Sequence, residues 1–494
     1  FPVDEGVALY RIGRLTVSNL LEQYPDPNVF PPLPGEPTGI TSIPGDAVYF
    51  ARNGVGGTAT DIGRITSGGG IPTFLNLATI ANGTITSLTT SSTNELWFTL
   101  DNGGSPFVGQ VLGVNQLNLY PVAVGSMPTG IGPGPDGTVW FAESNTERIG
   151  RVDLRVTMQP LSPLPTITEQ VNIDAYTQFG AVRRIEQDDV AVRTVILDGS
   201  LIPGAADGLT IQADNSVVQG LQIRLFSGSG VVIAGADSRG NVIEGNAIFS
   251  NVEDGVRVLG SNNLIGGAQF QSVNAIFANG RGVWLDNIGS EGNLVEGNSI
   301  SGNLGEGVRI TGSNNVVGGL TASKVNLLNA NERGVFLSGA RASGNKIQGN
   351  LIGVFLDDQG RTLANGNRRE GVRIENASGN IVGGSAAGSR NIISANNLTD
   401  LDGFGNPALS GGVVITGAGA FNNVVAGNYI GTDAQGSDRV IDIRGQLIGN
   451  NLSGVVIDNA SDNRVGGTQS LEGNIISNNR RDGVRITGQA ATRN

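Results

Sequence analysis

Short apolar words bounded by Gly and Asn recur through the last two thirds of the chain. A word that reads GV, or begins with G, followed by alternating apolar residues starts at Gly230, Gly255, Gly282 and Gly307, at spacings of 25, 27 and 25 residues. Two further apolar words, NVI and NAI, stand between the first two copies. Each repeat therefore predicts three strands of three to five residues with side chains alternating inward and outward.

Three short strands in about 25 residues are typical of one rung of a right-handed parallel β-helix. We expect roughly ten such rungs over residues 165–494, and a helical fold is disfavoured because Gly costs about 1 kcal/mol in a helix interior. The aliphatic residues expected to point into the core are Val256, Val258, Val283, Leu285, Val308 and Ile310.

The second apolar word has two spellings that alternate along the chain. One set reads NVIEGN, NLVEGN, NKIQGN and NVVAGN, and the other reads NLIGG, NVVGG, NIVGG and NRVGG before an inserted hexapeptide. We infer that the true unit is two rungs, in which one corner is tight in one rung and carries a small bump in the next. The recurring Asn residues predict a stacked hydrogen-bonding ladder. Binding of sugars or calcium by these amides is the alternative.

Charged and aromatic residues follow a second pattern around the GV word. The residue before the Gly alternates in charge from rung to rung, and the residue two places after it alternates between Arg and an aromatic. The first set is Asp254, Arg281, Glu306, Arg333 and Glu370, and the second is Arg257, Trp284, Arg309, Phe336 and Arg373. Rungs about 4.8 Å apart would then form a structural ladder of ion pairs and cation–π contacts. A polysaccharide-binding or cleaving site is the alternative, since acids beside arginines are the residue types it needs.

The regular spacing fails in the later rungs, where three long inserts leave the coil. Inserted loops on a rigid scaffold often carry function. No cofactor is expected from the sequence, but the insert acids are candidate calcium ligands, and they are Asp357, Asp358, Asp400, Asp402 and Asp433. Solvated turn carboxylates are the other interpretation.

A different repeat occupies residues 1–160. The words IGRL, IGRI, VGQV and IGRV recur at spacings of 50, 46 and 41 residues, and a pair of strand patterns precedes each of the last three. Each unit predicts an antiparallel blade of a β-propeller. We expect about three blades and a leading fragment, so that the propeller is incomplete or truncated. The chain is thus expected to be all-β, with propeller-like blades followed by a parallel β-helix solenoid.

Composition removes several classes of function. The chain of 494 residues has a formal charge of −12, no Cys and no His. A nucleic-acid partner is not expected because binding phosphates requires a basic face. Disulfides, thiolate sites and imidazole chemistry are ruled out by the missing residue types. The sequence contains no apolar stretch of about 18 residues, and a membrane-spanning helix is therefore not expected.

Both parts resemble known families. The stretch PTGIGPGPDGTVWFAESNTERIGRVD, within residues 6–154, resembles the repeats of streptogramin-lyase-like β-propellers. That resemblance implies a lyase with a catalytic His, a residue that this chain lacks. The words from about residue 164 onward resemble the β-helix repeats of secreted and surface-attached bacterial proteins, a fold that carries lyases, hydrolases, tailspikes and stalks alike.

From these observations we expect an extracellular or cell-surface protein without catalytic activity, serving a structural or adhesive role in a surface, sheath or filament. The alternatives are a carbohydrate-active enzyme, either lyase or hydrolase, and a glycan-binding module. Both ends of the sequence fall part-way through a repeat, and we therefore expect end-to-end self-association or contact with other surface components. Glycans are further candidate partners.

Overall fold

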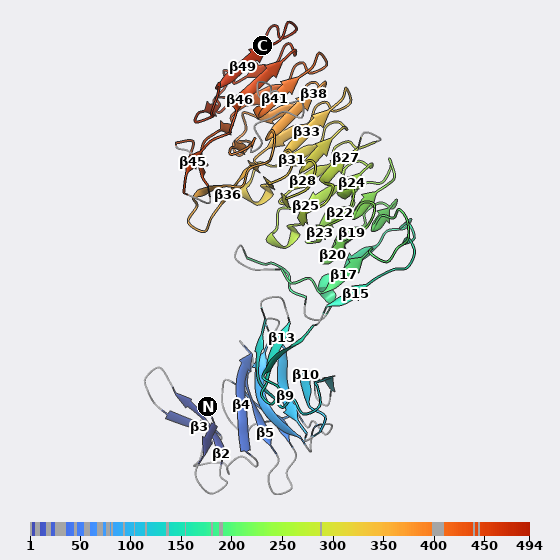
Figure 1. Cartoon of the computed structure of the whole chain (residues 1–494), viewed down its shortest axis with the longest axis vertical. Helices are drawn as coiled ribbons and strands as arrows, with labels where there is room; N and C mark the ends of the chain where they lie inside the picture. The colour runs from blue at the N-terminus through green and yellow to red at the C-terminus, as the bar shows by residue number, and fades with distance from the viewer. Residues whose placement is uncertain are drawn as a thin grey trace. The chain divides into compact units, whose positions relative to one another are not determined.

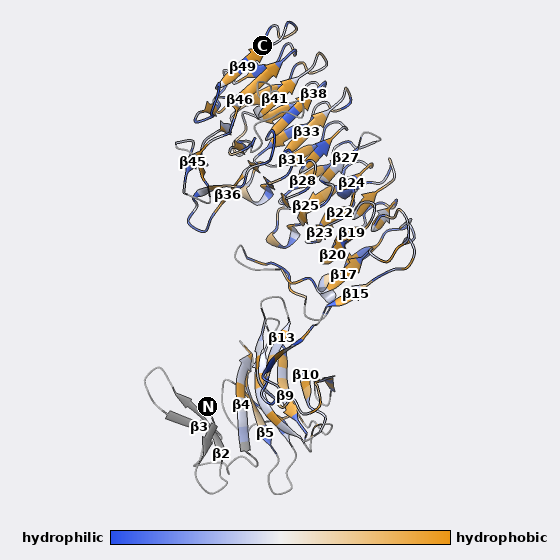
Figure 2. Ribbon diagram, in the orientation of Figure 1, coloured by the Kyte–Doolittle hydropathy of each residue, from blue (hydrophilic) through white to orange (hydrophobic). Residues whose placement is uncertain are grey.

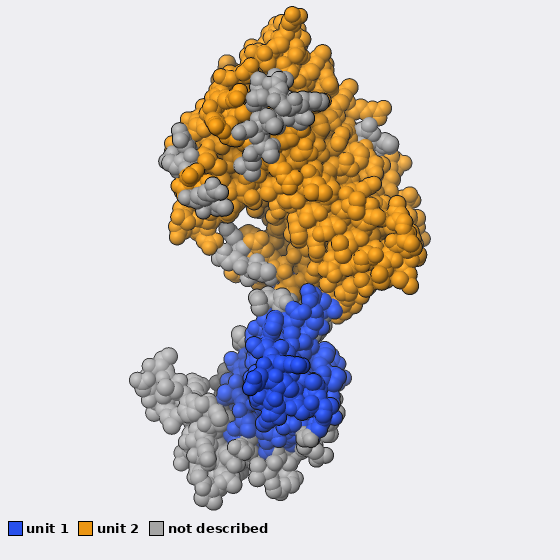
Figure 3. All heavy atoms as spheres, viewed as in Figure 1, with its two compact units in different colours: residues 1–155, 179–182 blue, residues 156–178, 183–494 orange. Residues whose placement is uncertain are grey.

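The computed structural model divides the chain into two compact units, residues 1–155 with 179–182, and residues 156–178 with 183–494 (Figure 3). The structure describes the chain except residues 1, 5–9, 16–20, 25–35, 44–46, 54–59, 67–72, 76–79, 81–82, 92–93, 103, 114–115, 135–137, 154, 179–180, 187–190, 287–288, 398–409, 438–439 and 443–444. Before residue 37 it describes strands without their side chains. Among the described residues, no helix is both long and apolar enough to span a membrane.

The N-terminal unit consists of small antiparallel sheets that are consistent with propeller blades (Figure 1). The first sheet is β1 (Pro2–Asp4), β2 (Tyr10–Leu15) and β3 (Leu21–Tyr24). The second is β4 (Glu36–Ile43), β5 (Ala47–Asn53), β6 (Asp61–Thr66) and β7 (Thr73–Phe74). The third is β8 (Thr84–Thr90), β9 (Leu96–Asp101), β10 (Phe107–Gly113) and β11 (Gln116–Pro121), and the fourth is β12 (Pro128–Pro133), β13 (Val139–Glu143) and β14 (Arg148–Val152).

The glycine of the IGR word has a packing role in these sheets. Gly63 on β6 is paired with Phe50 on β5, and a Cβ at Gly63 would lie 2.2 Å from the phenylalanine ring. The same relation holds between Gly150 and Phe141, which are partners on β14 and β13. The aromatic ring therefore covers the glycine of the adjacent strand, and this explains why a strand with Phe at the paired position precedes the IGR word.

The C-terminal unit, here called the coil, is a right-handed parallel β-helix with three long sheets, as predicted. Sheet 1 contains β15 (Val156–Met158), β17 (Val195–Asp198), β20 (Leu221–Arg224), β23 (Ala247–Phe249), β26 (Ala275–Phe277), β29 (Ser299–Ser301), β32 (Leu327–Asn329), β35 (Leu351–Ile352), β40 (Ile392–Ile393), β43 (Tyr429–Ile430) and β48 (Ile475–Ile476). Sheet 2 contains β16 (Asn172–Asp174), β19 (Val217–Gln219), β22 (Val242–Glu244), β25 (Leu264–Gly266), β28 (Leu294–Glu296), β31 (Val316–Gly318), β34 (Lys346–Gln348), β39 (Ile381–Gly383), β42 (Val424–Ala426) and β47 (Arg464–Val465). Sheet 3 contains β18 (Leu209–Ile211), β21 (Val231–Ile233), β24 (Asp254–Val258), β27 (Arg281–Leu285), β30 (Val308–Ile310), β33 (Val335–Ser338), β38 (Val372–Glu375), β41 (Gly411–Thr416), β46 (Ser453–Asp458) and β49 (Val484–Thr487).

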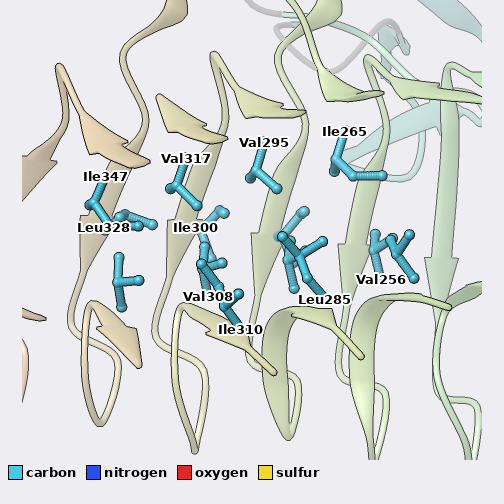
Figure 4. Packing of buried hydrophobic residues seen from close by; sticks show 14 of the residues in the cluster. Val256, Ile265, Leu285, Val295, Ile300, Val308, Ile310, Val317, Leu328 and Ile347 are labelled. Atoms are coloured by element: carbon cyan, nitrogen blue, oxygen red, sulfur yellow. The ribbon is translucent and has the colours of Figure 1, made fainter. Parts of the chain in front are cut away.

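The aliphatic core runs along the axis of the coil between these sheets. All six residues predicted to point inward are fully buried, and side chains from all three sheets meet in the close-up view (Figure 4). The strands are accordingly coloured as apolar segments between polar turns (Figure 2). Burial of each such side chain contributes about 1.5–3 kcal/mol, and identical positions stack on successive rungs, so the core fixes the register.

The Asn residues form three ladders along the coil, as predicted. In the ladder that contains Asn303, the Asn303 Oδ1 accepts hydrogen bonds from the backbone N–H and the Nδ2 of Asn279 on the preceding rung, at 3.0 and 3.2 Å. The Asn303 Nδ2 donates to the Asn331 Oδ1 on the next rung, at 2.9 Å. Because these buried amides satisfy one another and the backbone at each corner, the ladder is structural.

The two-rung unit is confirmed at two corners. Between sheets 2 and 1, the short 3-10 turns η3 (Phe270–Ser272) and η4 (Ala322–Lys324) occupy alternate rungs, and the intervening rungs turn tightly. Another short turn, η2 (Ala175–Thr177), precedes β17. At the corner before sheet 2, Gly292 and Asn262 both have positive φ, and a Cβ at Gly292 would lie 2.6 Å from the Asn262 Oδ1. From Asn215 to Gly344, Asn alternates with Gly at this corner because its side chain occupies the space above its neighbour, whereas Gly344 is followed by Gly379 on the next rung.

Two of the late inserts join in a small side sheet. It contains β36 (Val354–Leu356), β37 (Thr362–Ala364), β44 (Val440–Ile441) and β45 (Leu447–Ile448). Each insert forms an antiparallel hairpin, and the pairing of Leu363 with Ile441 joins the two hairpins. Val354 and Val440 are fully buried in a separate apolar cluster beneath this sheet.

Candidate functional site

The predicted charged and aromatic residues lie on the outer face of sheet 3. One set, the stacking column, consists of direct strand partners on β24, β27, β30, β33 and β38, and its members are Arg257, Trp284, Arg309, Phe336 and Arg373. The other set, the charged column, lies three residues earlier on each rung, and its members are Asp254, Arg281, Glu306, Arg333 and Glu370. The structure thus brings all ten predicted residues onto one face.

Ion pairs join the members of the charged column across rungs. The Arg281 Nε lies 2.5 Å from an oxygen of the fully buried Asp254. Arg333 contacts Glu306 at 3.4 Å and Glu370 at 2.8 Å. Burial raises the pKa of Asp254, and the hydrogen bond from Arg281 offsets this rise only in part. These carboxylates are therefore engaged by arginines of neighbouring rungs.

Glu370 is the centre of the network. It is fully buried, and besides Arg333 it contacts Arg373 at 3.3 Å and Arg369 at 3.8 Å, while the Ser410 hydroxyl donates to it at 3.1 Å. Burial by itself opposes ionisation of Glu370, but the attraction of Arg333, Arg373 and Arg369 outweighs it and lowers the pKa of Glu370. The carboxylate is held ionised as a counterion.

Trp284 is surrounded by guanidinium groups. The Arg257 and Arg309 side chains of the adjacent strands lie 4.5 and 5.5 Å from its ring centroid, and Arg281 lies 4.2 Å away. The Trp284 Nε1 donates to the Thr311 hydroxyl at 3.2 Å. Since the indole contacts a guanidinium on each neighbouring strand, it serves the stack and offers little ring face to a sugar.

Arg309 lies between Trp284 and Phe336, at 5.5 and 5.6 Å from their ring centroids. In the part of the chain that the structure describes, it makes no hydrogen bond or ion pair, and its Nε is buried without a partner. A surface groove of about 520 Å³ opens beside it, and Glu253, Glu306 and Glu332 line this groove. Arg309 is thus a cation held only by aromatic rings at the edge of a groove.

Sequence reasoning missed a third column, the flanking column, two residues beyond the stacking column. Its members are Leu259, Asp286, Thr311, Ser338 and Glu375. Arg257 is paired with Asp286 at 2.7 Å, and Arg373 is paired with Glu375 at 2.8 Å. The signal was present as an acid directly after a buried aliphatic residue, Leu285 or Ile374, but it does not recur on every rung.

The insert acids do not gather into a metal site in the described part of the chain. Asp357 accepts hydrogen bonds from the N–H groups of Gln359 and Arg361 in its own turn. Asp433 likewise accepts from the Ser437 N–H at 2.9 Å, and Asp358 is exposed. Asp400 and Asp402 lie outside the described residues. Among the residues described, no group of three or more potential ligands is placed to hold a metal ion.

Comparisons with known proteins match the two parts of the chain separately. Residues 7–172 match the model of the virginiamycin B lyase family, and residues 207–360 match the model of the right-handed beta helix region. Both resemblances inferred from the repeats are thereby confirmed. A search of curated proteins found no match to the chain.

Several solved structures match parts of the chain. The chain is 24% identical to an inactive virginiamycin B lyase from Staphylococcus aureus crystallised with quinupristin, with a TM-score of 0.24, and the match covers 30% of this chain and 50% of the lyase chain. It is 15% identical to the A-module of a mannuronan C-5 epimerase from Azotobacter vinelandii, with a TM-score of 0.30 and coverage of 60% and 73%. It is 14% identical to the periplasmic alginate epimerase AlgG, with a TM-score of 0.26 and coverage of 65% and 69%. The chain spans half the length of the lyase that it matches.

Proposed function

We propose that the coil is a non-catalytic, rigid scaffold that serves a structural or adhesive role outside the cell, at a cell surface, sheath or filament. The observation that carries this proposal is the pairing of carboxylates with arginines of adjacent rungs in the charged column. A catalytic acid needs a free oxygen that faces a substrate, whereas Asp254 and Glu370 are fully buried against guanidinium groups.

The contacts of the stacking column and the charged column support the proposal that the coil serves as a stiff scaffold. Arg309 and Trp284 link three successive strands of sheet 3, and Glu370 links Arg333 to Arg373 on the next strand. Removing one partner of a buried ion pair costs about 3–5 kcal/mol because the other charge is left unpaired. A face built in this way resists sliding of one rung over another, as a scaffold requires.

A carbohydrate-active enzyme is the rival function, and a pair of variants of the full chain separates the two. Under the scaffold proposal, Glu306→Gln and Arg309→Ala lower the melting temperature modestly and leave the release of reducing or unsaturated ends from a panel of acidic and neutral polysaccharides at the background level of the wild type. The exposed Gln212→Ala serves as the control for stability. Cleavage by the wild type that falls at least a hundredfold in Glu306→Gln would overturn the scaffold proposal.

The proposed location is tested separately in the native organism. We expect an antibody against the coil to label intact cells or the material that they shed. Labelling confined to the interior of opened cells would contradict an extracellular role.

A further inference from the structure

Two sheets of the N-terminal unit each pack one face against the sheet that follows in the chain. In the β4–β7 sheet, Tyr49 and Ile62 are buried in an apolar cluster with residues of the β8–β11 sheet. In the β8–β11 sheet, Trp97 and Val108 occupy the same places in the repeat, and both are buried in a cluster with residues of the β12–β14 sheet. Each following sheet therefore covers one aromatic and one aliphatic side chain of the sheet before it.

The corresponding face of the β12–β14 sheet is uncovered. Trp140 and Ile149 are the equivalent residues by their places in the repeat, and they are 40% and 74% exposed. A glycine on the first strand of the sheet shows the same contrast. A Cβ at Gly39 on β4 would lie 3.1 Å from the backbone nitrogen of Leu88 in the next sheet, whereas a Cβ at Gly130 on β12 would meet no atom of the described structure within 4 Å.

The strand that follows β14 does not form another blade. It is β15, which belongs to sheet 1 of the coil. The face that carries Trp140, Ile149 and Gly130, here called the open face, thus continues the series of sheet interfaces at a place where the described strands supply no next blade. Apolar positions that the same repeat buries on two other sheets, and exposes here, are typical of a surface that binds another protein.

The charged group beside the open face is paired within the chain. The Arg151 guanidinium lies 5.6 Å from the ring centroid of Trp140, and it pairs with Asp153 at 3.4 Å. The middle of the face is therefore apolar, and Gly130 leaves it flat. These properties favour a partner that is itself flat and apolar. The open face of a second copy has both properties, and a two-fold contact requires no other surface.

We propose that the open face binds the open face of a second copy of this chain, so that Trp140 and Ile149 of the two copies pack together about a two-fold axis. Because one face of a small sheet is at the lower end of interface size, the dimer should be reversible. This dimer goes beyond the scaffold role because it joins two scaffolds through their N-terminal units. It also differs from end-to-end association, since the open face lies within the chain.

Sedimentation equilibrium of the full chain over a range of micromolar concentrations tests the dimer. We expect Ile149→Asp to weaken association at least tenfold, because each copy then brings a carboxylate into the apolar contact. Leu304→Asp is the matched control, since Leu304 on the coil is also apolar and is 68% exposed. It should associate like the wild type, and both variants should keep the wild-type melting temperature because they replace exposed side chains.

A wild type that stays monomeric over this range would overturn the proposal, as would association of Ile149→Asp at the wild-type strength. Ile149→Cys tests the two-fold arrangement in a chain that has no other Cys. A short bismaleimide should link two copies of Ile149→Cys into a covalent dimer, and it should leave Leu304→Cys unlinked. Association that Ile149→Asp abolishes, without a link in Ile149→Cys, would show that the open face binds a different face of the second copy and would refute the two-fold contact.

Discussion

At the scale of single residues, the buried asparagines decide whether the corners of the coil can form. A parallel coil turns three times per rung, and each turn leaves backbone N–H and C=O groups that no strand partner satisfies. Asn303 accepts from the N–H of Asn279 and donates to the Ile276 carbonyl, so one side chain completes two backbone groups. Gln would be too long and Asp would lack the donor.

We predict that Asn303→Ala lowers the free energy of unfolding by about 2–4 kcal/mol, because it leaves two or more buried polar groups without partners. Asn303→Asp keeps the volume and the acceptor but loses the Nδ2 donor, and we expect it to be at least as destabilising. Chemical denaturation of the full chain measures both. A cost of Asn303→Ala no larger than that of Gln212→Ala, an exposed change on the same coil, would refute the structural role of the ladder.

At the scale of strands, the pairing of β33 with β38 brings Glu370 together with Arg333 of the preceding rung and Arg373 of its own rung. Because the pKa of Glu370 is lowered from its ordinary value of 4.5 in the folded chain, its ionised form is preferentially stabilised by folding. That contribution is complete above about pH 4.5 and is lost as the pH falls through the lower pKa of the folded state.

The Glu370→Gln variant tests this linkage. At pH 7 we expect it to unfold about 3–5 kcal/mol more easily than the wild type, because three arginines lose a buried counterion. The difference should narrow as the pH falls below about 4.5, because Glu370 of the unfolded wild type is protonated there, and Glu370 of the folded wild type is protonated only at its lower pKa. Melting temperatures from pH 7 to pH 3 give the comparison, with the exposed Asp237→Asn as control. A difference that stays constant or widens in acid would contradict the assignment.

The side sheet is a separate element whose strength depends on its own apolar cluster. We predict that Val440→Asp exposes the backbone amides of β36, β37, β44 and β45 to hydrogen exchange, since Val440 is fully buried between the two hairpins and the coil. Protection of β24, β27 and β30 should not change, because those strands belong to the main core. Loss of protection throughout the coil would show that the side sheet is part of the same cooperative unit.

The features that could be predicted from the sequence are those that recur with the rung repeat. The core positions, the Asn ladders and the alternation of Arg with Trp284 and Phe336 follow the repeat, and stacking converts a repeat in sequence into a contact in space. The counterions Asp286 and Glu375 do not follow it, because one lies on the next rung and the other lies on the same strand. The side sheet was missed for a related reason, since Leu363 and Ile441 pair across inserts that share no word.

At the scale of the whole molecule, corners, charges and aromatic residues alternate from one rung to the next. Two rungs are therefore the smallest segment whose deletion preserves this alternation. Gly255 and Gly307 are 52 residues apart, as are Gly282 and Gly334. Deletion of residues 256–307 joins equivalent positions, so that charges, aromatic residues and corners keep their partners. Deletion of residues 256–282 instead brings two tight corners together and removes Asn262, which fills the space above Gly292.

We predict that the chain lacking residues 256–307 folds with the circular dichroism of the full chain and a similar melting temperature. The chain lacking residues 256–282 should melt at a lower temperature or aggregate, although it loses fewer residues. Equal stability of the two deletions would show that the alternation at the corners has no energetic role.

The filling of a corner by Asn262 beside Gly292 also constrains how a gene for such a coil can lengthen. Unequal crossing-over between similar DNA repeats would yield a foldable product mainly when it adds or removes a full pair, here 52 codons. Tandem duplication of a single rung would place like corners next to each other, an arrangement that does not occur at this corner between Asn215 and Gly344. Natural alleles and orthologues of this coil should therefore differ in length by multiples of a rung pair, and copies two rungs apart should share more recent ancestry than adjacent ones.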